Sequence, residues 1–352
     1  MSIDREVTAS VDRRVVRPEA LDLQSPGRRD YWVALEHDSI WGDHLLPLTV
    51  LVGPEAAPGR GLVAFGATHG DEYEGPVALR HLLRELDLAR VRGRVVIVPV
   101  LNPAAFRAAA RDSVHDDGVN LNRAFVPGAG QAPLGGITHR VAAFVRASLW
   151  PHVHVVLDLH AGGQVARFLP CASFHAVPDP ARHALTEATA RGFGTPLVIT
   201  YQNETPGLLT SEAERLGKIA IGCELGWGGA VQAPGVAYAR QGVLAACGRH
   251  GQYDAPVPPP PPGQRRAGMV DRACFVPAPF AGHYEPLRAC GDEVRAGEPV
   301  GLLHDFERID LPPWPVRSGV DGVVIAQAWQ APVRQGQHVL VVGRLMPFGG
   351  SA

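Results

Sequence analysis

Short apolar runs that alternate with helical patterns restrict the fold of this chain more than any other feature of its sequence. Residues 62–65, 95–100 and 155–159 are almost entirely apolar, which is typical of strands inside a sheet that is covered on both faces. Between the first two runs, residues 76–89 repeat leucine at a helical period. The alternation predicts a three-layer α/β domain with a mixed, mostly parallel sheet, whose site lies at the carboxyl ends of the strands.

The same patterns divide the chain into four parts. Residues 1–29 are expected to be an irregular lead-in, residues 30–255 an α/β domain, residues 256–267 a proline-rich linker, and residues 268–352 an all-β domain. In the α/β domain the expected strands are residues 31–35, 45–52, 62–65, 95–100, 153–159, 197–201 and 219–224, and the expected helices are residues 76–89, 137–149, 180–193, 208–216 and 231–248.

The all-β part contains short strands between turns and no helical pattern. Residues 291–299 and 319–324 resemble the half-repeats of a biotinyl/lipoyl-type sandwich. Such carriers need an acceptor lysine, and the single lysine of the chain, Lys218, lies outside this part. We therefore expect a sandwich-like or barrel-like domain with a structural or lid role beside the site.

Composition excludes several classes of protein. The net charge of −2 gives no reason to expect nucleic acid or an anionic membrane as a partner. The five cysteines are widely spaced, which favours free thiols in a reducing compartment over disulfides or a thiolate zinc site. Apolar runs long enough for a signal peptide or a membrane span are absent from the sequence. We expect a soluble, cytoplasmic protein, and its oligomeric state, including a homo-oligomer, stays open.

The stretch from Gly66 to Gly75 carries the first chemical signal. His69 and Glu72 follow an apolar strand and are three residues apart, so an imidazole and a carboxylate can converge on one point. His160 ends a second apolar strand, and two histidines with one glutamate are a common ligand set for catalytic zinc. Asp158, two residues before His160 on the same strand face, is a candidate hydrogen-bond partner of that histidine.

Four motifs in order give the chain a recognisable pattern. They are His69-x-x-Glu72, the segment 117–125 (Asp-Gly-Val-Asn-Leu-Asn-Arg-Ala-Phe), His160 after its strand, and Cys223-Glu224-Leu225-Gly226. From about Asp30 to its end the chain resembles the succinylglutamate desuccinylase/aspartoacylase family, a branch of the zinc carboxypeptidase clan. The resemblance implies a zinc-carboxypeptidase-like domain with one Zn²⁺ per chain, held by His69, Glu72 and His160.

The resemblance also implies roles for other residues. Glu224 matches the general base that later acts as an acid, and Asn122 and Arg123 match the pair that holds a substrate carboxylate. Arg111 stands about where the family carries an arginine that stabilises the oxyanion, although its spacing is about one residue longer. Tyr284 is a candidate for a tyrosine that reaches the substrate from the second domain.

One position departs from the family pattern. Asn120 stands where zinc carboxypeptidases and aspartoacylase have an aspartate that orients a zinc-bound imidazole, so the acceptor here carries no charge. The motif forms are closer to bacterial deacetylases of N-acetylated diamino acids than to aspartoacylase.

The predicted function is a zinc-dependent deacylase that cleaves the amide of a small N-acyl amino acid. Two alternatives stay open. An ester hydrolase or a carboxypeptidase could use the same site, and a metal-free binding protein could be built on a decayed scaffold. The sequence contains no Gly-x-Ser-x-Gly, His-Glu-x-x-His or Walker-type motif.

Overall fold

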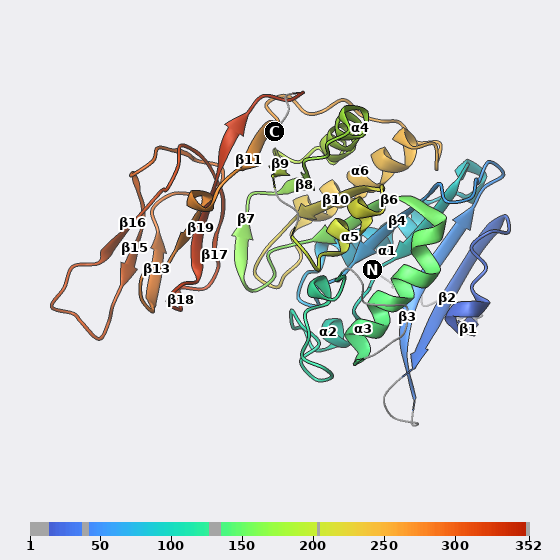
Figure 1. Cartoon of the computed structure of the whole chain (residues 1–352), viewed down its shortest axis with the longest axis horizontal. Helices are drawn as coiled ribbons and strands as arrows, with labels where there is room; N and C mark the ends of the chain where they lie inside the picture. Colours follow the sequence, from blue (N-terminus) through green and yellow to red (C-terminus); the bar gives the residue numbers. More distant parts are fainter. Residues whose placement is uncertain (1–13, 37–41, 127–134, 203–204, 350–352) are drawn as a thin grey trace, which may run out of the picture.

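The computed structural model describes residues 14–36, 42–126, 135–202 and 205–349. A large mixed sheet and a smaller β-sandwich at one end of it make up the molecule (Figure 1). In spatial order the strands of the large sheet are β1 (Arg14–Val16), β2 (Gly27–Glu36), β3 (Asp43–Val52), β5 (Arg94–Val98), β4 (Gly61–Gly66), β6 (Val153–His160), β10 (Ile219–Glu224), β8 (Cys171–His175), β9 (Leu197–Tyr201) and β11 (Arg265–Met269).

The centre of the sheet is parallel. Strand β4 pairs in parallel with β5 and β6, and β6 pairs in parallel with β10. Strand β8 runs antiparallel to β10 but parallel to β9. Because β4, β6 and β10 point the same way, the loops that follow them meet at one edge of the sheet.

Helices cover both faces of this sheet. Alternate residues of β4 separate the two cores: Val63 and Phe65 pack on one side, and Leu62 and Ala64 on the other. The first core includes residues of α2 (Pro103–Arg107), α3 (Ile137–Phe144) and α5 (Leu209–Arg215). The second includes residues of α1 (Glu74–Glu85), α4 (Pro180–Arg191) and α6 (Ala233–Arg249).

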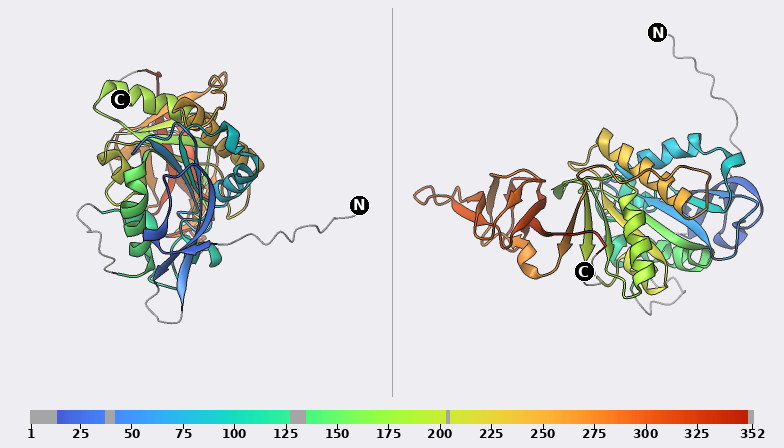
Figure 2. Two further views of the ribbon diagram at one scale, coloured as in Figure 1. Left: turned by 90° about the vertical axis from the view of Figure 1, so that its right-hand side faces the viewer. Right: turned by 90° about the horizontal axis from the view of Figure 1, so that it is seen from above.

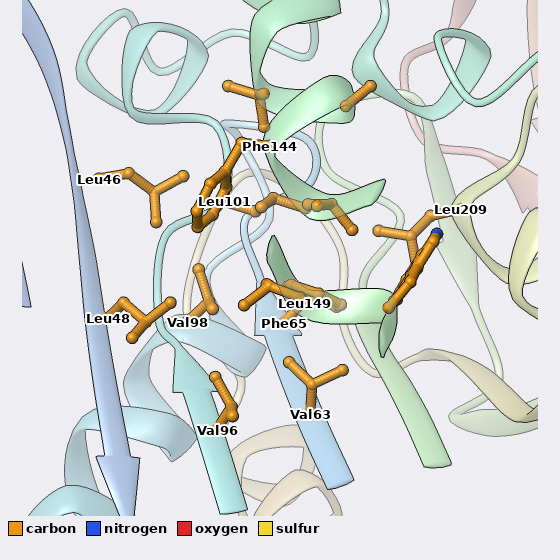
Figure 3. Packing of buried hydrophobic residues seen from close by; sticks show 14 of the residues in the cluster. Leu46, Leu48, Val63, Phe65, Val96, Val98, Leu101, Phe144, Leu149 and Leu209 are labelled. Atoms are coloured by element: carbon orange, nitrogen blue, oxygen red, sulfur yellow. The ribbon is translucent and has the colours of Figure 1, made fainter. Parts of the chain in front are cut away.

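Figure 3 shows part of the first core, where Leu46 and Leu48 of β3 lie beside Val96 and Val98 of β5. Phe144 packs over them from the end of α3. Burial of each large aliphatic or aromatic side chain contributes about 1.5–3 kcal/mol, so this packing holds α3 on the sheet.

The sandwich is built from two antiparallel sheets that enclose a third core. One sheet contains β16 (Trp314–Arg317), β15 (Pro299–His304), β13 (Gly282–Pro286) and β18 (Pro332–Val333). The other contains β12 (Phe275–Pro277), β19 (His338–Met346), β17 (Gly322–Ala328), β14 (Glu293–Val294) and β7 (Ala166–Phe168). The predicted fold class, a three-layer α/β domain with a smaller all-β sandwich, is confirmed (Figure 2).

Two expected boundaries need correction. Residues expected to be an irregular lead-in form β1 from Arg14 and the start of β2 from Gly27. The expected linker of residues 256–267 ends inside β11, which pairs in parallel with β9 and antiparallel with β19. Strand β11 begins with Arg265 and Arg266. Arg266 is buried, and its guanidinium donates a hydrogen bond to Thr200 and forms an ion pair with Glu187. Because β11 begins with two charged residues, it lacks the apolar pattern from which strands are predicted.

Among the described residues, none of the helices combines the length and the apolar character that a membrane crossing requires.

Candidate active site

The ends of three neighbouring strands carry the chemical groups of the site. His160 is the last residue of β6, Glu224 is the last residue of β10, and the two positions are paired in the ladder. His69 and Glu72 lie in the loop between β4 and α1. That loop passes so close to α2 that a Cβ at Gly70 would clash with the backbone of Ala105.

Glu72 lies between the two imidazoles. Its Oε1 is 2.8 Å from Nδ1 of His69, and its Oε2 is 2.8 Å from Nδ1 of His160. All three side chains are buried, and their candidate ligand atoms lie within 4.8 Å of one another. The backbone N–H of Ala161 also donates to Oε2 of Glu72 and fixes the orientation of the carboxylate.

Each imidazole also faces an oxygen acceptor on its far side. Nε2 of His69 is 3.1 Å from Oδ1 of Asn120, and Nε2 of His160 is 2.8 Å from Oδ2 of Asp158. Oδ1 of Asn120 also accepts the backbone N–H of Asn122, which fixes the orientation of this amide. The expected contact between Asp158 and His160 is therefore present.

This arrangement fits a metal cation. A neutral imidazole has one N–H; with a cation between Nδ1 and Glu72, that N–H would be on Nε2, where Asn120 accepts it from His69 and Asp158 from His160. The Nδ1 lone pairs of His69 and His160 then face carboxylate oxygens, an arrangement that a cation between them stabilises. Nitrogen and carboxylate donors of this kind are those of catalytic zinc sites.

The charges of the site are strongly coupled. Burial raises the pKa of Glu72, but the two histidines outweigh this effect and hold the pKa well below its usual range. Burial likewise lowers the pKa of His160, but Asp158 and Glu72 outweigh it and raise the pKa well above its usual value.

Glu224 is the carboxylate at the end of β10, opposite His160 in the ladder. Within the described part of the chain its Oε2 is buried without a hydrogen-bond partner. Burial, and next the nearby charge of Glu72, raise its pKa to about 8, although His160 and Arg111 act in the opposite direction. A carboxyl group with this pKa can both accept and release a proton near neutral pH.

A loop after α2 carries the arginines. Asp117 fixes this loop, because its carboxylate accepts hydrogen bonds from the hydroxyl and backbone N–H of Thr138 and from the N–H of Val119. Arg111 donates to Oε1 of Glu72 at 3.2 Å. Arg123 donates to its neighbour's carbonyl, and burial, together with Arg111, lowers the pKa of its guanidinium.

The same loop places Asn122 next to the imidazoles. Its Nδ2 lies 3.2 Å from Nε2 of His160, and its Oδ1 accepts the N–H of Leu209 at the start of α5. The side chain therefore links His160, a candidate metal ligand, to the start of α5.

Most of these side chains line one cavity of about 250 Å³. The residues expected from the sequence that line it are His69, Arg111, Asn122, Arg123, His160 and Glu224. Tyr284 does not reach it: that residue is 4% exposed and belongs to the core of the sandwich. Its placement at the substrate was wrong, because it relied on a correspondence between whole domains and not on a local motif.

Another group of lining residues was not expected from the sequence. Ser173, His175, Tyr201, Thr210 and Glu214 come from β8, β9 and α5. Strand β8 was not expected, and the alternation of Ser173 with His175 on one strand face was the only signal that could have revealed it.

Comparison with known proteins gives a consistent result. Residues 58–248 match the model of the succinylglutamate desuccinylase/aspartoacylase catalytic domain. The chain is 33% identical over 310 residues to the N-alpha-acetyl-L-2,4-diaminobutyric acid deacetylase of Halomonas elongata, and the match covers 88% of each protein.

Solved structures agree with this match. A succinylglutamate desuccinylase/aspartoacylase from Rhodobacter sphaeroides superposes with a TM-score of 0.85 at 30% identity, covering 93% of this chain and 98% of the other. The product-bound ectoine utilization protein EutE (DoeB) from Ruegeria pomeroyi gives a TM-score of 0.82 at 31% identity, covering 92% and 98%.

Proposed function

The chain belongs to the succinylglutamate desuccinylase/aspartoacylase family and is a deacylase of that type, and on this basis we propose that it is a zinc-dependent hydrolase of small N-acyl amino acids. The observation that carries the proposal is the convergence of His69, Glu72 and His160 at a cavity that both histidines line together with Glu224 and two arginines.

His69, Glu72 and His160 would hold the metal through the two Nδ1 atoms and the Glu72 carboxylate. Zinc bound there would supply a water molecule with a pKa of about 7 and would polarise the carbonyl group of the substrate. Asn120 and Asp158 keep both rings in the tautomer that leaves Nδ1 free as a donor atom.

Glu224 transfers a proton from the attacking water to the leaving nitrogen. As water attacks the acyl carbon, a Glu224 oxygen accepts a proton from it, and the same carboxyl group then protonates the nitrogen as the C–N bond breaks. The products are a carboxylate and a free amino acid. The raised pKa of about 8 favours this dual role, because it lies near working pH.

Arg111 and Arg123 are assigned to two different negative charges. Arg111 contacts Glu72, so it lies beside the metal donors, and we assign it to the oxygen that gains charge during attack. Arg123 has no carboxylate within ion-pair distance among the described residues, so we assign its planar guanidinium, with Asn122, to the substrate carboxylate.

The size of the cavity supports a small substrate. Its volume of about 250 Å³ is below the range of about 300–1,000 Å³ that is usual for drug-sized ligands. An N-acyl amino acid fits this limit, whereas a long peptide would have to extend out of the cavity.

Metal analysis and a substrate panel test the proposal together. We expect about one zinc per chain in the purified protein, and hydrolysis of N-acetyl or N-succinyl amino acids that stops with chelator and returns with zinc. Hydrolysis of matched esters only would favour the ester-hydrolase alternative. Absence of both zinc and hydrolysis would favour the binding-protein alternative.

A further inference from the structure

Three loops at the carboxyl edge of the sheet hold the proposed catalytic groups in place. The first joins β4 to α1 and carries two of the proposed metal ligands. The His160 loop, residues 161–165, follows β6, and the Glu224 loop, residues 225–232, follows β10. The spacing between the metal ligands and the proton acceptor therefore depends on how these loops are held against one another.

Asp71, the residue before Glu72, contacts the His160 loop. Its side chain is buried, and its Oδ2 accepts the backbone N–H of Gln164 at 2.8 Å. The carboxylate also lies directly against Gly163, which has a φ of +50°, and a Cβ at that position would overlap Oδ2. Asp71 therefore fixes the loop that begins one residue after His160.

Glu74, two residues after Glu72, contacts the Glu224 loop. It is the first residue of α1 and is 0% exposed. Its Oε1 accepts the backbone N–H of Gln232 at 3.0 Å, and a Cβ at Gly226 would overlap the same oxygen. The turn that follows Glu224 therefore packs directly on the Glu74 carboxylate.

The main chain holds the other side of this turn. The N–H of Leu225 donates to the carbonyl of His160 at 3.0 Å, and the N–H of Gly162 donates to the carbonyl of Gly226 at 2.8 Å. Glu74 binds the turn from the side of α1, and the His160 loop binds it from the other side. Loss of the Glu74 contact would leave the turn held on one side.

A carboxylate in the first turn of a helix also interacts favourably with the helix N-terminus. That role would stabilise α1 without any effect on the site. It does not explain why Glu74 contacts Gln232 and Gly226, since both belong to the Glu224 loop. Neither Asp71 nor Glu74 is among the described residues that line the cavity, so any effect on the reaction must pass through the loops.

We propose that Asp71 and Glu74 are positioning residues with separate targets: Asp71 places His160 among the metal ligands, and Glu74 places Glu224 against the substrate. The inference rests on the proposed deacylase function. A displacement of about 1 Å in a reacting group can lower a rate by about 100-fold. Loss of the contacts that orient a metal ligand lowers metal affinity by about 10- to 100-fold.

The test compares leucine and amide variants at the two positions. Glu74→Leu should lower kcat by roughly 10- to 100-fold with little change in KM and with zinc at about one per chain. Asp71→Leu should weaken zinc binding by roughly 10- to 100-fold in chelator competition. Glu85→Gln is the control on the same helix and should match the wild type, since Glu85 pairs with Arg240 on an exposed surface.

The amide variants distinguish the hydrogen bond from the bulk of the side chain. The second oxygen of each carboxylate is buried without a hydrogen-bond partner among the described residues, so Glu74→Gln and Asp71→Asn keep the accepting oxygen. Both should retain most of the wild-type kcat and zinc affinity. Amide variants as impaired as the leucine variants would overturn the proposed role of the accepting oxygens.

Hydrogen exchange of the chelator-treated protein gives a measurement that needs neither metal nor substrate. Glu74→Leu should speed exchange by roughly tenfold in the Glu224 loop, and Asp71→Leu should do so in the His160 loop. Equal changes in both loops for each variant, or equal losses of kcat and zinc affinity, would assign both residues to general stability and overturn the proposal.

Gly226→Ala perturbs the same contact without changing Glu74, so the proposal stays testable if a leucine variant does not fold. It should lower kcat as Glu74→Leu does and keep zinc, whereas a normal kcat would overturn the role of Glu74. If the wild type neither binds zinc nor cleaves N-acyl amino acids, the deacylase function fails. The exchange measurements would still show whether each carboxylate holds its loop.

Discussion

Glu224→Gln separates proton transfer from metal binding, because it keeps the shape of the side chain and removes the carboxylate. Oε2 of Glu224 has no hydrogen-bond partner among the described residues, so the amide replaces it without breaking a contact. A positioned general base contributes about 10²–10⁴ in rate, or about 3–5 kcal/mol of activation free energy. We expect kcat to fall by this factor while zinc stays at about one per chain.

The same variant tests the electrostatics of the metal-free protein. Burial, with Glu72, raises the pKa of Glu224 from 4.5 to about 8. A folded-state pKa above the unfolded one means that the proton stabilises the fold fully below about pH 4.5, and that this contribution is lost as the pH rises to about 8. The loss is on the order of 3–5 kcal/mol, and Glu224→Gln should not show it.

Urea unfolding of chelator-treated protein between pH 5 and pH 8 measures this difference. The free energy of unfolding of the wild type should fall relative to that of Glu224→Gln over this range, and Glu85→Gln should follow the wild type. Parallel curves would mean that Glu224 does not experience the buried environment described above. Loss of zinc in Glu224→Gln would identify Glu224 as a ligand, and an unchanged kcat would assign the proton transfer to another group.

Three further substitutions test the remaining assignments. His160→Ala should reduce zinc well below one per chain and abolish hydrolysis, and stoichiometric zinc with normal turnover would contradict the ligand set. Arg123→Ala should lower kcat/KM for an N-acetyl amino acid by roughly 10- to 100-fold but hardly change that for its carboxamide, and Arg123→Lys should not restore it; a mutant that discriminates as well as wild type would make Arg123 structural. Asn120→Asp adds a charged acceptor at His69 and should tighten zinc binding by roughly tenfold in chelator competition; unchanged affinity would show that this contact does not tune the metal.

The strands that position the proposed metal ligands could be predicted, because a strand that is buried on both faces is apolar along most of its length. Strands β4 and β10 lie between two helical layers, so almost every residue in them is apolar. The expected strand at residues 219–224 coincides with β10. Asp158 could be placed beside His160 from strand alternation alone, and the contact of 2.8 Å agrees with that prediction.

Strands β1 and β11 were not predicted, because neither has an apolar pattern in its sequence. Strand β1 has three largely exposed residues and forms only because β2 offers a free edge. Strand β11 buries an arginine whose partners, Thr200 and Glu187, lie far away in the sequence. Polar groups that are satisfied by distant partners cannot be recognised from local periodicity.

Some residues of the candidate site could likewise be predicted from the sequence, and others could not. His69, Glu72, His160 and Glu224 belong to motifs whose order is recognisable, whereas Glu214 is one of two acidic residues in the expected helix of residues 208–216. Glu212, two residues earlier, has a structural role, since it accepts hydrogen bonds from Arg146 and from the indole of Trp150. Only the packing of α5 against β10 decides which of the two carboxylates enters the cavity.

The wall of the cavity at Tyr201 depends on the sandwich, although none of the described residues of the sandwich lines the cavity. Tyr201 ends β9, which pairs with β11 along its whole length, and β11 pairs with β19 of the sandwich. On the other side β7, which precedes β8, pairs with β17. A domain attached only by a proline-rich linker could move freely as a lid, but the pairing of β9 with β11 and of β11 with β19 fixes this sandwich to the strand that carries Tyr201. The proposed metal ligands are positioned by β4, β6 and the loop before α1 instead. Substitutions that loosen the sandwich should therefore change which amino acid is accepted before they change the affinity for zinc.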